Sequence, residues 1–187
     1  MSMPESDPEI QAMPLVGVHF ASGQAIDAVL ARAAEELTRR GFRVAGLVQE
    51  NGQRTDDCAC REMRLRDLAT GQLTRISEDR GTQARGCHLD WQALTELSVK
   101  LERELSDETD VLIVNRFGRS ESEGQGFRGA IEKALSLGVQ VIVAYRDGYA
   151  GPWEAFHGGL ATPCGATVEE IVRICEGNRS PAPQPAS

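Results

Sequence analysis

The sequence predicts a three-layer α/β domain with a mostly parallel β-sheet and a β-hairpin insertion, and three observations support this class. Short apolar runs at 14–20, 42–49, 110–115 and 139–145 have the length and composition of buried strands. Segments with apolar residues at helical spacing follow these runs, which is the alternation that produces parallel sheets. The segment at about 60–78 alternates between polar and apolar residues around a turn, as a hairpin with one solvated face does.

The chain opens with a predicted β-α-β unit. Residues 14–20 (PLVGVHF) form the first strand, and a helix is expected from 25 to 40, where apolar residues recur every three or four positions. Gly41 ends that helix, and 42–49 (FRVAGLVQ) forms the second strand. Because a helix connects the two strands, we expect them to be parallel.

A hairpin and a further helix and strand come next. The alternating stretches 62–68 and 73–77 flank a turn at 69–72 (ATGQ), and the hairpin is either an insertion or the antiparallel edge of the sheet. Asp90 is placed to cap the following helix. The run 110–115 is the most apolar strand, so we expect it at the centre of the sheet.

The last third of the chain continues the same alternation. A helix is expected at 126–137, a buried strand at 139–145, a short helix around 153–156 and a last helix at 167–176. The pattern is typical of one α/β domain.

Length and composition set the limits of the domain and of its partners. We expect a single domain at 14–177, with disordered tails at 1–13 and 178–187 because both are polar and marked by prolines. The formal charge of −8 argues against nucleic acid or an anionic membrane as the main partner. No signal peptide or membrane-spanning run is recognised, and the odd count of five cysteines favours reduced thiols, so a cytoplasmic protein is expected.

The turn after the first strand is the first candidate site. A loop that wraps phosphates needs the pattern Gly-x-x-x-x-Gly-Lys-Ser/Thr, in which the lysine supplies charge and the hydroxyl binds Mg²⁺. The stretch 17–25 (GVHFASGQA) has Gly23 at the bend, but Gln24 and Ala25 stand at the lysine and hydroxyl positions. Ser22, Gly23 and the helix N-terminus could still bind an anion. The alternative is a plain tight turn.

The loop after the central strand is the second candidate site. Its first two residues, Asn115 and Arg116, replace the acid that would hold Mg²⁺ in a nucleoside triphosphatase. Its arginines could bind an oxyanion or a phosphate through paired hydrogen bonds, or its glutamates could neutralise them in a solvated connection. We expect at least one arginine to be free of these glutamates. The candidate ligand-binding residues of the loop are Asn115, Arg116, Arg119, Glu121, Glu123, Gly124, Gly126 and Arg128.

The cysteines near the hairpin are the third candidate. Cys60 and Cys87 flank the hairpin and could approach each other as soft-metal ligands or as a redox pair. The spacing of Cys58 and Cys60 is poor for zinc, because only one residue separates them and zinc sites usually have two to four residues between the cysteines. Unrelated reduced cysteines are the alternative.

Several segments, in order along about 15–160, resemble a bacterial domain family of unknown function that is often encoded beside molybdate-transport genes. The segments that carry the likeness are 43–49 (RVAGLVQ), 63–71 (MRLRDLATG), 76–77 (IS) with 80–81 (RG), 86–90 (GCHLD), 114–118 (VNRFG) and 121–128 (ESEGQGFR). That family is similar in turn to small, hairpin-bearing P-loop nucleoside triphosphatases that accept varied nucleotides. The resemblance implies their fold and a role in molybdenum handling, here with a degenerate P-loop.

Three functions follow as hypotheses. The first is a binding protein for an oxyanion or phosphate-bearing ligand, such as a nucleotide, molybdate or a molecule related to the molybdenum cofactor. The second is a nucleoside triphosphatase with an unconventional metal site at Glu121 or Glu123, so whether the chain is an enzyme stays open. The third is an interaction module whose hairpin docks a protein partner in molybdate transport.

Overall fold

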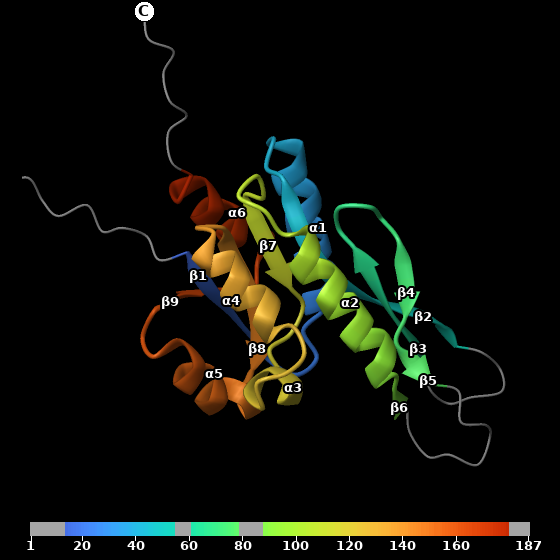
Figure 1. Ribbon diagram of the computed structural model, residues 1–187. Helices are drawn as coiled ribbons and strands as arrows, with labels where there is room; N and C mark the ends of the chain where they lie inside the picture. The colour runs from blue at the N-terminus through green and yellow to red at the C-terminus, as the bar shows by residue number, and fades with distance from the viewer. Residues whose placement is uncertain (1–13, 55–60, 79–87, 180–187) are drawn as a thin grey trace, which may run out of the picture.

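A seven-stranded sheet between two layers of helices forms the framework of the protein (Figure 1). The computed structural model describes residues 14–54, 61–78 and 88–179. The strands of the sheet are β1 (Leu15–Phe20), β2 (Val44–Arg54), β3 (Arg61–Asp67), β4 (Leu73–Arg75), β7 (Val111–Val114), β8 (Gln140–Arg146) and β9 (Ala161–Cys164). Their order is β4-β3-β2-β7-β8-β1-β9, and the five strands from β2 to β9 pair in parallel. The predicted fold class is confirmed.

Helices cover both faces of this sheet. They are α1 (Ile26–Arg39), α2 (Trp91–Glu104), α3 (Arg119–Ser122), α4 (Arg128–Ser136), a 3₁₀ turn η1 (Asp147–Tyr149), α5 (Ala150–His157) and α6 (Val168–Gly177). One hydrophobic core joins α1 and α6 to the sheet, and a second core joins α2, α4 and α5 to the opposite face. Figure 1 shows α2 and α4 lying across the front of the sheet.

Local sequence explains where the main helices begin and end. Ile26, Leu30 and Leu37 of α1 are buried on one face of the helix, as their three- and four-residue spacing favours. The predicted cap Asp90 accepts a hydrogen bond from the N–H of Ala93 at 2.9 Å. Helix α5 ends at Gly158, which adopts the left-handed conformation that closes helices.

The apolar strand β7 is the middle strand of the seven, as predicted. All four of its residues are buried, and it pairs in parallel with β2 on one side and β8 on the other. Its neighbour β2 approaches closely at Gly46, where a Cβ atom would lie 2.0 Å from the carbonyl oxygen of Ile113. Gly46 also has a φ of +130°, so both contact and conformation require glycine there. Asn115 directly follows β7, so the pairing of β7 with its two neighbours positions Asn115 at the carboxyl edge of the sheet.

The hairpin forms the antiparallel edge of the sheet. Strand β3 pairs with β2 and β4 pairs with β3, both antiparallel. Asp67 holds the turn by accepting hydrogen bonds from the N–H groups of Ala69 and Thr70, and Lys100 of α2 donates to the same carboxylate at 2.8 Å. Burial opposes ionisation of Asp67, but Lys100 and the two N–H groups outweigh it and lower its pKa. The hairpin is thereby fastened to α2.

Several elements differ from the sequence-based expectation. Strand β2 continues past residue 49 to Arg54, because the antiparallel partner β3 supplies hydrogen bonds to that extension. The edge strand β9 was not predicted, since it has only four residues and contains Pro163, which edge strands tolerate. The short helix α3 and a two-stranded sheet of β5 (Ser77–Glu78) and β6 (His88–Leu89) were also missed.

The predicted tails at 1–13 and 178–187 fall almost entirely outside the described residues, but the structure describes Arg179. Arg179, assigned to the C-terminal tail, instead donates hydrogen bonds to the carbonyls of Arg40 and Gly41. It also lies over the ring of Phe42, at 4.3 Å from the ring centroid. The remainder of the two tails, 1–13 and 180–187, lies outside the described residues.

Candidate functional site

The carboxyl ends of β1, β7 and β8 bring two of the predicted sites together. Parallel strands direct their carboxyl ends to one edge of the sheet, where ligands of open α/β folds bind. The turn at 21–25 follows β1, and the loop at 115–127 follows β7. Asp27 in the first turn of α1 contacts both Asn115 and Arg116, so the two segments meet directly.

The turn after β1 is closed by one of its own side chains. Gln24, at the expected lysine position, accepts a hydrogen bond from the N–H of Ala21 through its side-chain oxygen at 2.6 Å. Gly23 has a φ of +87° and provides the bend. Ser22 and Gly23 are exposed, and the N-cap residue of α1, Ala25, makes no side-chain capping hydrogen bond. Backbone N–H groups therefore remain available at this turn.

Asp27 is the polar centre of the edge, and the sequence analysis missed it. Its Oδ1 accepts a hydrogen bond from Nδ2 of Asn115 at 3.0 Å. Nη2 of Arg116 donates to both carboxylate oxygens, at 3.1 and 3.2 Å. The guanidinium of Arg116 also lies 5.7 Å from the centroid of the Phe20 ring. An acid in the first turn of the helix after β1 was the available signal, since that turn faces the same edge.

The other two arginines of the loop also have acidic partners. Arg119 binds Glu123 one helical turn away at 2.8 Å, and Arg128 binds Glu132 at 2.9 Å. Arg128 lies over the ring of Phe156 as well. Arg116 and Arg128 are thus free of the two loop glutamates, as expected, but each is paired with a different acid.

Glu121 holds the loop together from within. Its side chain is buried, and its two oxygens accept hydrogen bonds from the N–H groups of Gly118 and Phe127, both at 3.0 Å. Gly126 has a φ of +61°, and a Cβ atom there would lie 2.2 Å from the Glu121 carboxylate. Gly124, with a φ of +84°, provides the preceding turn. Glu121 and these glycines shape the loop rather than extend toward solvent.

Arg146 is the arginine at this edge without an acidic partner. It is the last residue of β8 and is exposed, and among the described residues no carboxylate contacts it. Its guanidinium lies 5.7 Å from the centroid of the Tyr149 ring. Arg116, Arg146, Phe20 and Tyr149 line one cleft of about 160 Å³. Sequence analysis missed Arg146, although its place at the end of a predicted buried strand was a usable signal.

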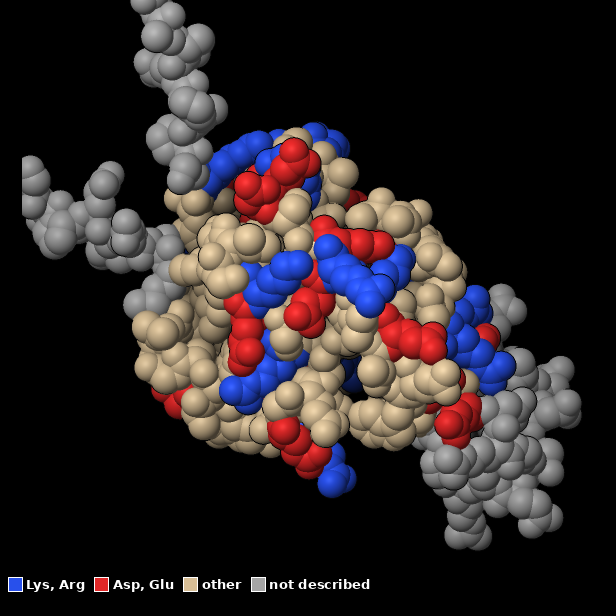
Figure 2. All heavy atoms as spheres, in the orientation of Figure 1, with Lys and Arg blue, Asp and Glu red and all other residues tan. Residues whose placement is uncertain are grey.

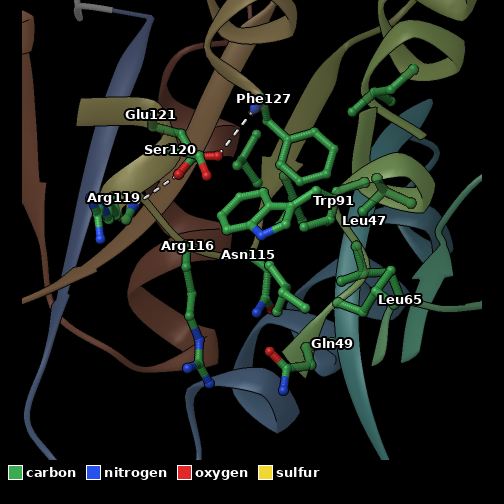
Figure 3. A pocket seen from close by; sticks show the side chains of 17 residues that line it. Leu47, Gln49, Leu65, Trp91, Asn115, Arg116, Arg119, Ser120, Glu121 and Phe127 are labelled. Carbon is green, nitrogen blue, oxygen red and sulfur yellow. Dashed lines mark hydrogen bonds between the residues drawn. The ribbon is translucent and has the colours of Figure 1, made fainter. Parts of the chain in front are cut away.

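A larger apolar pocket of about 240 Å³ lies on the other side of β7, between that strand, β2, the hairpin and α2 (Figure 3). Its walls include Leu47, Leu65 and Phe127, and Trp91 stands at its rim. Asn115 lines the pocket, and its Oδ1 is buried without a hydrogen-bond partner within the described ranges. The dashed lines in Figure 3 mark hydrogen bonds that Glu121 accepts, one of them from the N–H of Phe127.

The metal and thiol hypotheses gain no support from the described part of the chain. Cys60 and Cys87 lie outside the described residues. Within the described ranges, no group of three or more His, Cys, Asp or Glu residues is arranged to hold a metal ion. Cys164 and Cys175 are buried, which raises the pKa of Cys164 to about 11 and that of Cys175 to about 12, so both stay protonated at neutral pH.

The distribution of surface charge and the length of the helices can be compared with the partners that the sequence predicts. The face in Figure 2 shows basic and acidic side chains interspersed, with no large area of one sign among the described residues. No helix in the described ranges has the length and apolar character needed to cross a bilayer.

Comparison with known proteins identifies the family. Residues 15–173 match the model of the family described as "Protein of unknown function (DUF2478)", and the chain belongs to this family. It is 29% identical over 161 residues to the protein named "Molybdenum import ATP-binding protein ModC 2" of Bradyrhizobium diazoefficiens. That match covers 86% of this chain but only 18% of the length of the relative.

Two solved structures share the fold. The solution structure of a human cancer-related nucleoside triphosphatase matches with a TM-score of 0.66 and 14% identity, over 89% of this chain and 99% of that chain. THEP1 from the hyperthermophile Aquifex aeolicus matches with a TM-score of 0.55 and 15% identity, over 87% and 96% of the two chains. These likenesses establish a nucleoside-triphosphatase-like α/β fold.

Proposed function

We propose that the protein binds a phosphate-bearing or oxyanion ligand at the carboxyl edge of the sheet, in the cleft between Arg116 and Arg146. The observation that carries this proposal is the pairing of two arginines across one cleft of about 160 Å³, one of them without an acidic partner among the residues that the structure describes. A guanidinium offers five N–H donors in a planar fork that suits phosphate and similar anions. Arg116 uses only Nη2 on Asp27 and so keeps further donors.

The turn after β1 supplies the second half of this proposed site. The exposed Ser22 and Gly23 lie beside the uncapped N-terminus of α1, where N–H groups and the helix dipole favour anions. The nucleoside-triphosphatase-like fold supports nucleotide or phosphate binding in general, and open α/β sheets bind ligands at the carboxyl ends of their strands. The negative charge of Asp27 disfavours an anion nearby, and the same carboxylate binds Arg116. The affinity of the wild-type site for an anion therefore depends on how strongly Asp27 holds Arg116.

We expect binding without efficient hydrolysis. In P-loop nucleoside triphosphatases, catalysis rests on charge stabilisation by a lysine and by Mg²⁺ held through a hydroxyl and an acid. Gln24, Ala25 and Asn115 occupy those positions here, which is the basis for calling the loop degenerate. The alternative of a metal site at Glu121 or Glu123 has little to favour it, because the first binds backbone N–H groups and the second binds Arg119.

A calorimetric titration with a matched variant tests the anion site. Inorganic phosphate, molybdate, ATP and GTP are titrated with and without Mg²⁺ into wild type, Arg146→Gln and the control Arg103→Gln, which removes an exposed charge from α2. Arg146→Gln should weaken binding roughly ten- to a hundredfold, the effect of losing one charged hydrogen bond of about 1.5–3 kcal/mol. The control should bind as wild type does.

The same titrations address the ligand and the mechanism. Binding should weaken as salt rises, because salt screens exposed charges. ATP and GTP should release no phosphate above a blank. If Arg146→Gln and Arg103→Gln bind every probe equally well, or if none of the four anions binds to wild type, the proposed anion site is wrong.

A role in molybdenum handling is the finer part of this proposal. The relative whose name refers to molybdenum import contains a stretch similar to this whole domain within a chain several times longer. This observation favours molybdate as one probe and a component of molybdate transport as a protein partner. Co-expression with a molybdate importer and copurification of the two proteins tests the partner, and independent elution of both would remove it.

A further inference from the structure

We propose that the apolar pocket between β7, the hairpin and α2 is a second ligand site, which binds a flat aromatic or heteroaromatic ring carrying one N–H or O–H donor. This pocket lies on the side of β7 away from the turn after β1, and Arg146 does not line it. The inference therefore does not rest on the proposed anion site.

The requirement for a hydrogen-bond donor on the ligand follows from the side chain of Asn115. The residue is 7% exposed, and its Nδ2 donates to the carboxylate of Asp27, which can only accept. The orientation of the amide is thus fixed, and Oδ1 is left as the acceptor. This Oδ1 is buried with no hydrogen-bond partner among the described residues. Buried acceptors in native proteins are nearly always satisfied, so an orphaned one that lines a pocket points to a donor on a ligand.

The requirement for an aromatic ring on the ligand follows from the residues that line the pocket. Leu47, Leu65 and Phe127 make most of the surface apolar, and a site of this kind takes its selectivity from a few polar groups. Trp91 stands at the rim with 57% of its surface exposed, although a tryptophan is costly to leave in water. In Figure 3 the indole of Trp91 and the ring of Phe127 lie at the mouth above Asn115. Aromatic rings so placed can pack against an entering ring.

The volume suits a ring system of two fused rings. The pocket measures about 240 Å³, whereas an apolar cavity of about 150 Å³ is enough for benzene. The pocket and the anion cleft share Arg116 and Gly118, so a ring bound here would lie next to the anion cleft. A heteroaromatic compound with an attached anionic group is the chemical class that could occupy both.

Two probes of the same shape test the proposal on the wild-type protein. Indole carries an N–H donor, and benzofuran has the same fused rings with an oxygen and no donor. Calorimetry should show saturable binding of indole that is about three- to tenfold tighter than that of benzofuran, the effect of one neutral hydrogen bond. In a ¹H–¹⁵N spectrum, indole should shift the side-chain N–H signal of Trp91, identified with Trp91→Phe, and leave that of the buried Trp153 unchanged.

A pair of variants on α2 tests the location. Leu94→Trp fills the pocket and should abolish indole binding, whereas Val99→Trp, on the exposed side of the same helix, should not. Both variants should bind inorganic phosphate as wild type does, which separates failure of this site from failure of the anion site. Equal affinities for indole and benzofuran, no saturable binding of indole, or undiminished binding by folded Leu94→Trp would overturn the proposal. The probe comparison decides the question even if Leu94→Trp does not fold.

Discussion

Replacing Asp27 with asparagine should strengthen anion binding, which is the reverse of what most substitutions in a binding site do. In wild type the Asp27 carboxylate accepts two contacts from Nη2 of Arg116, at 3.1 and 3.2 Å. It also places a negative charge beside the proposed anion cleft. Asparagine keeps an oxygen that can accept from Asn115, so the local geometry should persist while the charge is removed.

The structure sets the size of both effects. The side chain of Arg116 is 43% exposed, so the loss of its ion pair should cost only about 0–1 kcal/mol of folding free energy. Nη2 of Arg116, released from the carboxylate, can form one additional charged hydrogen bond with the anion, which contributes about 1.5–3 kcal/mol. Binding of phosphate should therefore tighten roughly ten- to a hundredfold, since about 1.4 kcal/mol corresponds to a factor of ten.

Calorimetric titration of inorganic phosphate, at two salt concentrations, measures this gain. Asp107→Asn is the matched control, because it removes the same charge from an exposed position before the amino end of β7. Urea unfolding of each variant reports folding stability separately. Phosphate affinity that is unchanged or weaker in Asp27→Asn, with folding intact, would refute the reasoning that Asp27 competes with the ligand for Arg116.

Three further predictions concern the framework of the site, and urea unfolding measures each. Gly46→Ala should lower the free energy of unfolding by about 3 kcal/mol or more, because the new Cβ would overlap the Ile113 carbonyl and alanine would have to adopt an unfavourable positive φ. A loss below about 1 kcal/mol would contradict the close approach of β2 and β7. Glu121→Ala should cost about 2–4 kcal/mol by leaving two N–H groups unpaired, and a neutral result would show that the loop does not depend on it. Wild type should exceed Asp67→Asn in stability at neutral pH, and the gap should shrink as pH falls through the lowered pKa of Asp67, below its usual 3.8. The ion pair between Asp67 and Lys100 should also weaken as the pH rises through the pKa of Lys100, which the Asp67 carboxylate raises above 10.5. A stability difference between wild type and Asp67→Asn that is constant with pH would exclude the ion pair as its cause.

The order of strands and helices could be predicted because hydrophobic periodicity is local. The buried runs β1, β7 and β8 and the amphipathic helices α1 and α2 each carry their pattern within a few consecutive residues. Strand β9 was missed because an edge strand of four residues with a proline has almost no such pattern. The length of β2 was underestimated because its extension depends on pairing with β3, which is a tertiary contact.

The sequence by itself also determined that charged residues follow the central strand, and that Gln24 and Ala25 follow Gly23 in the turn after the first strand. Which charges pair was decided only by the tertiary structure, because a charged side chain takes its partner from spatial neighbours. Asp27 is 88 residues from Asn115 in the sequence, yet their side chains form a hydrogen bond. Glu121 could be foreseen as an acid in the loop, but only the fold turned it inward and left Arg146, on another strand, without an acidic partner in the described part of the chain. The pocket beside Asn115 likewise exists because β2, β7 and α2 come together in space, and no single segment encodes it.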